Sequence, residues 1–239
     1  MIKVITSKDN NKIKHAASLK MSKYRHEYHE FLAEGIKSLE LALKAGVVKE
    51  IFTTKEIKGI KDDIVQYIVN ESLLKKLAFS QNPEGIVFIC LMQDKNIKKF
   101  DKAIYLDHVS DPGNMGTIIR TALAFDYDAI FVSEGCCDIY NEKVVAASKG
   151  SLFMIPIIKR DIVELKKSAQ IVVSTLNDKA VELSQIEVKK PFVLVLGNEA
   201  HGVEKEVEDI ADISVKINIQ NIDSLNVSVA AGILMHYFK

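Results

Sequence analysis

Short apolar runs alternate with amphipathic segments along the second half of the chain, a pattern typical of strands followed by helices. The apolar runs are AIYL, AIFV, FMIPII, IVVST, FVLVL and DISVKI. Helical periodicity predicts helices at 115–125, at 142–149, after Asp161, after Val203 and at 224–238. Because strands buried on both faces are nearly continuously apolar, this half is expected to form a parallel sheet covered by helices on both sides.

The first 92 residues predict a smaller α/β unit. Helices are expected at 12–21, 34–45 and 71–79, and strands at 47–52 and 86–92. Gly46 is placed to end the second helix, and Asn70 is placed to cap the third. Residues 93–102 are nearly all polar, so the domain boundary is expected there, between domains of residues 1–95 and 101–239.

Composition mainly excludes classes of protein. Hydrophobic residues make up 48% of the chain, with only 11 Gly and 4 Pro in 239 residues, which excludes a disordered or collagen-like protein. The longest apolar run, 229–235, is far shorter than the roughly 18 residues of a membrane span, so neither a membrane anchor nor a signal peptide is expected. Cys90, Cys136 and Cys137 lack CxxC spacing, so we expect no metal site and a reducing, cytoplasmic location.

Charge is balanced overall, with 32 basic and 32 acidic residues, but it is unevenly distributed. Residues 1–25 contain seven basic residues (Lys3, Lys8, Lys12, Lys14, Lys20, Lys23 and Arg25) and one acidic residue, Asp9, a local balance of +6. This segment could contact phosphates of a nucleic acid, although a solvated helix face is the commoner explanation of such a charge run.

Candidate chemistry lies in three loops that each follow a predicted strand. The first, DHVSDPGNMG, leads into a helix that contains Arg120 within the apolar string IIRTALAF. Only 3 of the 32 basic residues are arginines, and a planar, permanently charged guanidinium in this position suits a phosphate. A buried arginine–carboxylate pair or a charge at the helix rim is the alternative.

The second and third loops are LVLGNEAHGV and INIQNIDSLNVSVAAG. Glycines at the end of a strand, such as Gly197, let a ligand approach the backbone, although an ordinary strand-to-helix turn also explains them. Ser224 is expected to cap the last helix, which leaves Asn226 as a buried amide without an assigned role. No GxGxxG, GxxxxGK[ST], GxSxG or HExxH motif is present, so a conventional nucleotide-dependent enzyme with a doubly wound sheet lacks its phosphate loop.

Taken in order, DPGNMGTIIRTALAF, LVLGNEAHG and DSLNVSVAAGI resemble the three motifs of the SpoU (TrmH-like) family of RNA ribose 2′-O-methyltransferases, in the SPOUT superfamily. The resemblance continues through KVVAASKGSLF, and TSKDNNKIKHAASL with FLAEGIKSLELALKAG resembles the family's N-terminal RNA substrate-binding domain. The chain departs from the family at Asp126, where Gly is usual, at Ala146 (Arg), at Lys149 (Met) and at Asn218 (Pro). The loop that leads to Ser224 also lacks the family's glycine.

The resemblance implies an α/β catalytic domain with a deep trefoil knot, joined to a small N-terminal α/β RNA-binding domain. It implies S-adenosylmethionine as cofactor, bound in the knot by Leu196, Gly197, Ile217, Ile219 and Leu225. The implied reaction is 2′-O-methylation of a ribose in structured RNA, with 23S rRNA as the favoured substrate and tRNA as the second choice.

The implied catalytic residues are Arg120, Asn114, Glu199, Ser224 and Asn226. Because a guanidinium resists deprotonation, Arg120 is expected to clamp the adjoining phosphate and stabilise the developing alkoxide rather than act as a base. Asn114 would orient the ribose or Arg120, while Glu199 would hold Asn114 or receive the proton through water. Ser224 and Asn226 would position the first loop.

A homodimer is also expected, because members of the family complete the RNA site across two subunits. The apolar residues of the last helix, Val227, Ile233, Leu234 and Tyr237, exceed what one sheet needs to cover it. The alternative function is a non-catalytic RNA-binding or ribosome-assembly protein, which the basic N-terminal unit and the departures in the third motif would favour.

Overall fold

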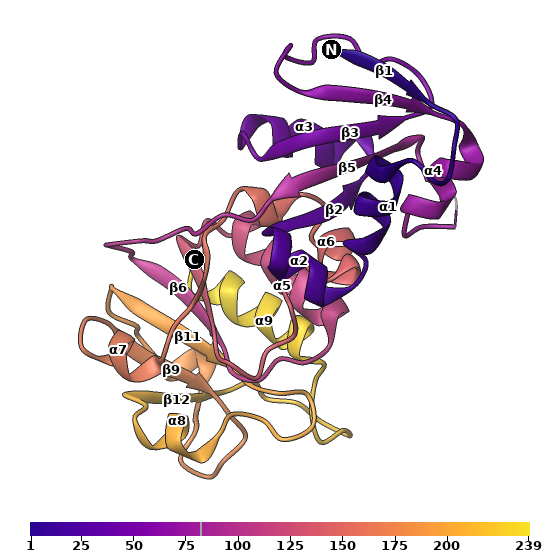
Figure 1. Cartoon of the computed structure of the whole chain (residues 1–239). Coiled ribbons are helices and arrows are strands. Elements are labelled where there is room, and N and C mark those ends of the chain that lie inside the picture. Colours follow the sequence, from indigo (N-terminus) through magenta and orange to yellow (C-terminus); the bar gives the residue numbers. More distant parts are fainter. Residues whose placement is uncertain (82) are drawn as a thin grey trace. The chain divides into compact units, whose positions relative to one another are not determined.

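The computed structural model describes residues 1–81 and 83–239, which divide into two compact units (Figure 1). The first unit contains Met1–Gln93 together with Tyr140–Met154, and the second contains Asp94–Ile139 together with Ile155–Lys239. The polar stretch at 93–102 therefore coincides with the first crossing between units. Residues 140–154 pack with the first unit, although they belong to the second half of the sequence.

The first unit is built on a five-stranded sheet in the order β1-β4-β3-β5-β2. Its strands are β1 (Ile2–Ile5), β2 (Glu30–Glu34), β3 (Val48–Thr53), β4 (Val65–Val69) and β5 (Ile86–Leu91). Strands β1, β4 and β3 are parallel, and β5 is antiparallel to both β3 and β2. Sequence periodicity identifies β3 and β5 but misses the other three, in part because Glu30 and Gln66 interrupt the apolar pattern while being buried.

Helices cover both faces of this sheet. They are α1 (Asn11–Ser18), α2 (Ser22–Tyr28), α3 (Ile36–Lys44), α4 (Glu71–Leu77) and α6 (Glu142–Ser148), with a 3₁₀ turn at Ser151–Phe153. The expected cap of α4 is confirmed, since the Asn70 side chain accepts from the Leu73 amide at 2.9 Å. Gly46, which follows the C-cap residue Ala45 of α3, has φ +69°, the left-handed conformation that ends a helix at little steric cost.

The segment 140–154 joins the aromatic core of the first unit. The Phe153 ring centroid lies 6.1 Å from that of Phe31 and 6.5 Å from that of Phe88, and the Tyr140 centroid lies 4.6 Å from that of Phe31. Phe31 and Phe88 belong to β2 and β5, so this segment covers one face of the sheet at those strands. A cut near residue 95 would therefore remove the surface on which residues 140–154 pack.

Much of the positive charge in the first 25 residues is used within the first unit. Lys12 pairs with Glu50, Lys14 lies 3.6 Å from Asp9, and Lys20 donates to the Ala78 carbonyl at 2.7 Å. The expectation of a solvated face is wrong for Arg25, which is 4% exposed and donates to the carbonyls of Leu19 and Lys20. Lys3, Lys8 and Lys23 stay exposed, so only part of the +6 balance is available to a partner.

The second unit confirms the expected parallel sheet. Seven strands lie in the order β10-β12-β9-β11-β6-β7-β8, and every adjacent pair is parallel. They are β6 (Lys102–Leu106), β7 (Ala129–Val132), β8 (Ile157–Lys159), β9 (Gln170–Ser174), β10 (Val181–Glu182), β11 (Phe192–Leu196) and β12 (Ile213–Lys216). Only the end of the run FMIPII forms a strand.

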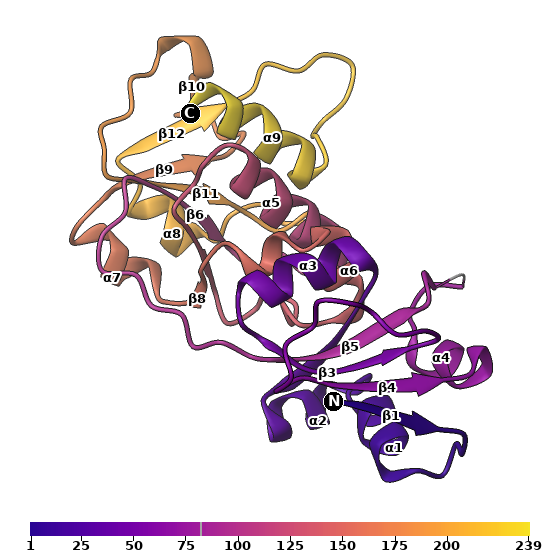
Figure 2. The same ribbon diagram turned by 90° about the horizontal axis from the view of Figure 1, so that it is seen from above.

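The helices of this unit lie on both faces of the sheet (Figure 2). They are α5 (Pro112–Ala124), α7 (Ile162–Lys166), α8 (Lys205–Asp209) and α9 (Val227–Tyr237), with a 3₁₀ turn at Leu183–Gln185. Alternate strand residues form a core with α7 and α8, and the intervening residues point to the face that α5 and α9 cover. Among the described residues, no helix is both long and apolar enough to cross a membrane.

The last helix begins later than the sequence suggests. Asn226, not Ser224, caps α9, because its Oδ1 accepts from the Ser228 amide at 2.9 Å. The expectation that Asn226 is buried is also wrong, since its side chain is exposed. Ser224 precedes the cap by two residues and is exposed as well.

Three residues at or near departures from the family pattern adopt left-handed backbone conformations. Asp126 has φ +59°, Lys149 has φ +50°, and Asn221, in the glycine-free loop before Ser224, has φ +67°. Glycine reaches this region without steric cost, whereas a residue with a Cβ is strained there, Asn and Asp less than others. The chain therefore places residues with a Cβ at three points where glycine would adopt the same backbone conformation without strain.

We predict that Asp126→Gly raises the free energy of unfolding by about 0.5–1 kcal/mol, since relief of left-handed strain outweighs the added chain entropy. Denaturant titration of the purified protein measures this change. Asp126→Ala is the matched control, because it removes the same carboxylate but keeps Cβ, and it should be no more stable than the parent protein. A Gly variant that is equally or less stable would contradict this account.

Candidate functional site

The loops that contain the candidate residues meet at the carboxyl edge of the parallel sheet. The loops after β6, β9 and β11 and the segment after β12 all leave the sheet at this edge, because parallel strands end on the same side. Residues that are distant in sequence are thus brought together by the second unit alone.

A chain of side-chain hydrogen bonds joins all three motifs. Asn226 Nδ2 donates to Asn114 Oδ1 at 3.0 Å, and Asn114 Nδ2 donates to Glu199 Oε1 at 2.9 Å. The direction of this chain is set by the helix cap, since Asn226 Oδ1 is occupied by the amide and hydroxyl of Ser228. Asp111 caps α5 and accepts from the Asn114 amide at 2.8 Å, which places Asn114 in the first turn of that helix.

Arg120 lies on α5, and its side chain points away from the core. It is exposed, whereas its neighbours Ile118 and Ile119 are fully buried. Within the described part of the chain its guanidinium makes no hydrogen bond or ion pair, so the alternative of a buried arginine–carboxylate pair does not apply. The positive charge is available to an external anion.

A cavity of about 370 Å³ opens between the loops after β9 and β11 and the segment after β12. Its lining includes all five residues that the family resemblance associates with the cofactor, namely Leu196, Gly197, Ile217, Ile219 and Leu225. Glu199 and Ser224 also line it, whereas Asn114, Arg120 and Asn226 do not. Glu199 therefore belongs both to the cavity and to the hydrogen-bond chain that leads to Asn114.

The loop after β11 closes so tightly that only glycine fits at position 197. A Cβ on Gly197 would lie 2.2 Å from the carbonyl carbon of Gly202, closer than real contacts allow. The backbones of Asn198 and Gly202 are bridged by hydrogen bonds of 2.8 and 2.9 Å. The close backbone contact accounts for a glycine at this position as a tight turn, and the same turn forms a wall of the cavity.

Sequence reasoning missed Asn198, which holds this loop in place. Its Oδ1 accepts from the amides of Ala200 and His201, and its Nδ2 donates to the carbonyl of His108 at 2.8 Å. The loops after β6 and β11 are thereby joined a second time. In the sequence, the sign of this structural role is an asparagine between a glycine that ends a strand and a turn.

Three further polar residues of the cavity were also missed. Glu208 of α8 accepts from the Thr175 hydroxyl and, at 3.3 Å, from Asn177 Nδ2, and all three residues line the cavity. Thr175 and Asn177 lie just beyond β9, in a loop that resembles none of the motifs. The one sign in the sequence that this loop belongs to the site is that it follows a strand and therefore lies at the same edge of the sheet.

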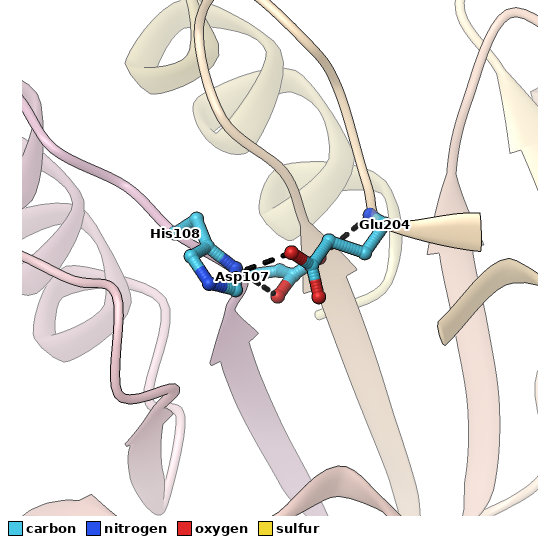
Figure 3. A group of neighbouring side chains, drawn as sticks. All are labelled: Asp107, His108 and Glu204. Carbon is cyan, nitrogen blue, oxygen red and sulfur yellow. Dashed lines mark hydrogen bonds and ion pairs between the residues drawn. The ribbon is translucent and has the colours of Figure 1, made fainter. Parts of the chain in front are cut away.

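A second polar cluster consists of Asp107, His108 and Glu204, whose side chains face one another in Figure 3. Asp107 is 1% exposed, and its oxygens accept from His108 Nδ1 at 2.9 Å and from the Glu204 amide at 2.8 Å. His108 Nε2 lies 3.5 Å from Glu204 Oε1. Although atoms of all three approach within 4.8 Å, as metal ligands would, both oxygens of Asp107 are engaged within the cluster, which explains it as a tie between two loops.

The cysteines near these loops are poor nucleophiles. Burial raises the pKa of Cys137 to about 12 and also raises the pKa of Cys136. Burial raises the pKa of Cys90, which lies within β5, well above its ordinary value. All three are therefore thiols at neutral pH, so a mechanism through a cysteine adduct is not favoured.

Comparison with known proteins agrees with this geometry. Residues 101–236 match the SpoU rRNA Methylase family, and residues 10–87 match the MRM3-like substrate binding domain. A Bacillus subtilis protein named 23S rRNA (guanosine(2553)-2'-O)-methyltransferase RlmP is 32% identical, with 100% of each chain covered.

Solved structures give the same result. The AdoMet-bound rRNA methyltransferase from Sinorhizobium meliloti matches with a TM-score of 0.89 and 30% identity, covering 99% of this chain and 97% of that one. The AdoMet complex of the SpoU methyltransferase AviRb from Streptomyces viridochromogenes has the same fold, with a TM-score of 0.85 at 22% identity over 96% and 97% of the two chains. The chain belongs to the SpoU rRNA methylase family.

Proposed function

We propose that this protein transfers the methyl group of S-adenosylmethionine to a ribose 2′-oxygen of structured RNA, with 23S rRNA as the favoured substrate. The observation that carries the proposal is the position of Glu199. It lines the cavity of about 370 Å³ and also accepts from Asn114 in the first motif. Cofactor pocket and polar reaction site are thus joined through one side chain. The Bacillus relative supports the choice of 23S rRNA over tRNA.

The cavity suits a nucleoside cofactor of this kind. Its volume is within the usual range for small-molecule sites, and its walls combine apolar residues such as Leu196, Ile217, Ile219 and Leu225 with polar ones and with Gly197. S-adenosylmethionine supplies a methyl group on a positively charged sulfur, which leaves as S-adenosylhomocysteine when the oxygen–carbon bond forms. The protein must align the 2′-oxygen, exclude water and accept a proton.

The exposed guanidinium of Arg120 is suited to bind a phosphate of the RNA and to stabilise negative charge on the 2′-oxygen. It stays protonated, so it does not remove the proton itself. We assign Glu199 as the group that receives that proton, through water, because its carboxylate accepts a hydrogen bond from Asn114. Asn114 orients the ribose, and Asn226 and Ser224 hold the first loop and the cavity wall.

We further propose that the second unit forms a deep trefoil knot. Support comes from the segment after β12, which lines the same cavity as the loops after β9 and β11 and therefore runs beside two loops that precede it in sequence. We place the protein in the cytoplasm, where its RNA substrate is found.

The proposed domain roles assign RNA binding to the N-terminal domain of residues 1–95 and methyl transfer to residues 101–239. The match to a substrate-binding domain supports the first role. Lys3, Lys8 and Lys23 are the exposed cations of the N-terminal segment that suit RNA phosphates. Point variants at these lysines test this role better than truncation, because residues 140–154 pack on the first unit.

The reaction is tested by the fate of a labelled methyl group. Alkali cleaves RNA only next to a free 2′-hydroxyl, so transfer to the ribose should give a labelled, alkali-resistant dinucleotide after incubation with 23S rRNA. Label in a mononucleotide with a methylated base would refute the proposal. No label with ribosomal or transfer RNA, despite RNA binding, would favour the non-catalytic alternative.

We predict that Arg120→Lys lowers turnover by about 10²–10³-fold, because a lysine keeps the charge but loses the planar fork that contacts phosphate and oxyanion together. Single-turnover assays measure the rate, and calorimetry measures affinity for S-adenosylmethionine, which should stay unchanged because Arg120 does not line the cavity. Normal turnover of the Lys variant would remove Arg120 from the site.

Gly197→Ala is expected to weaken S-adenosylmethionine binding by about tenfold or more, since displacing a packed loop costs on the order of 1–3 kcal/mol. Gly232→Ala on α9 is the matched control, because its Cβ would lie 4.0 Å from Thr121 Cγ2, an ordinary contact. Calorimetric titration compares the two variants. Equal affinities would show that the loop after β11 does not shape the cofactor site.

A homodimer remains part of the proposal, with a revised surface. Val227 and Leu234 belong to the core, at 8% and 0% exposed, whereas Val229, Ile233 and Tyr237 of α9 are 51%, 39% and 46% exposed. We predict that the protein has twice its 26.7 kDa chain mass in solution and that Ile233→Glu reduces this to one chain. Light scattering during gel filtration measures both masses, and a monomeric parent protein would contradict the prediction.

A further inference from the structure

The cavity contains a second carboxylate that the proposed mechanism does not use. Glu208 lines the same space as Glu199 but comes from α8, beside the loop after β9. Glu199 is bonded to Asn114 of the reaction site, whereas the hydrogen-bond partners of Glu208 are Thr175 and Asn177. The two carboxylates therefore serve different parts of the cavity.

Two hydrogen bonds hold the Glu208 carboxylate in one orientation and leave both of its oxygens able to accept another. The Thr175 hydroxyl donates to Oε1, and Asn177 Nδ2 donates to Oε2 at 3.3 Å. An ionised carboxylate has about four accepting positions, so each oxygen keeps one for a ligand. Fixed by its neighbours, Glu208 offers two further acceptors side by side at the lining of the cavity.

S-adenosylmethionine offers three kinds of hydrogen-bond donor. The adenine amino group is flanked by ring nitrogens whose lone pairs would repel a carboxylate. The ammonium group is attached to the carbon that also carries the anionic carboxylate. Only the ribose diol offers two adjacent O–H donors without an anionic neighbour, which matches the two remaining acceptors of Glu208.

We propose that Glu208 binds the ribose diol of S-adenosylmethionine, with Thr175 and Asn177 as its positioning residues. The inference rests on the proposed role of the cavity as the cofactor site. It adds a specific contact with the sugar of the cofactor to the lining of the pocket. Such a contact selects ribonucleosides over deoxyribonucleosides, because loss of a hydroxyl leaves a desolvated carboxylate without its donor.

The test uses Glu208→Gln in the full-length protein and three ligands. Affinity for S-adenosylhomocysteine and for 5′-methylthioadenosine, which lacks the amino-acid group, should each fall by about tenfold, as expected for hydrogen bonds to a charged acceptor. The 2′,3′-dideoxy form of methylthioadenosine should bind the variant at least as well as the parent protein, because it has no diol contact to lose and the variant buries no unpaired charge. Glu206→Gln on the same helix is the matched control and should leave all three affinities unchanged, since Glu206 does not line the cavity.

Each other outcome overturns the inference. A loss with S-adenosylhomocysteine but not with methylthioadenosine would show that Glu208 binds the ammonium group. An equal loss with the dideoxy ligand would show that Glu208 only holds the loop after β9, and circular dichroism would reveal a variant that fails to fold. Gly197→Ala distinguishes the proposal that Glu208 binds the diol from the proposal that the cavity binds the cofactor. If it weakens binding while Glu208→Gln does not, only the diol contact is wrong, whereas unchanged binding in both variants would reject the cavity as the cofactor site.

Discussion

The hydrogen-bond chain from Asn226 through Asn114 to Glu199 is the interaction on which the arrangement of the three loops depends. It joins residues that are 112 and 85 positions apart in sequence. Because Asn226 also caps α9 and Asn114 lies in the first turn of α5, the relative position of two adjacent helices determines the geometry of the site. An exposed polar network of this kind contributes modestly to stability, but it gives the loops one preferred arrangement.

Arg25 and Arg120 place the same charged group in opposite settings, one buried and one exposed. Arg25 is buried and donates to backbone carbonyls, so its guanidinium fixes the turn after α1. Arg120 is exposed and, among the described residues, has no partner of its own. A guanidinium left without a partner is suited to an external anion, since it loses no internal bond when it binds.

The first unit depends on residues from the second half of the chain. Phe153 and Tyr140 complete the aromatic cluster around Phe31, although the polar stretch at 93–102 marks an apparent boundary. The composition of a linker shows where the chain leaves a unit, but it does not show that a later segment packs with that unit again. A truncation near residue 95 would therefore expose apolar surface, which makes point variants the better probes of this unit.

The sequence by itself determined the parallel sheet, the family and the three loops, because apolar runs and motif strings are local patterns. The strand FVLVL and the Asn70 cap were correct to the residue. Only the tertiary structure decided which residues of those loops meet: that Asn226 rather than Ser224 caps α9, that Val227 and Leu234 are core residues, and that Glu208 and Glu199 line one cavity. The physical reason is that strand and helix propensities act over a few neighbours, whereas burial and side-chain pairing depend on segments brought together by folding.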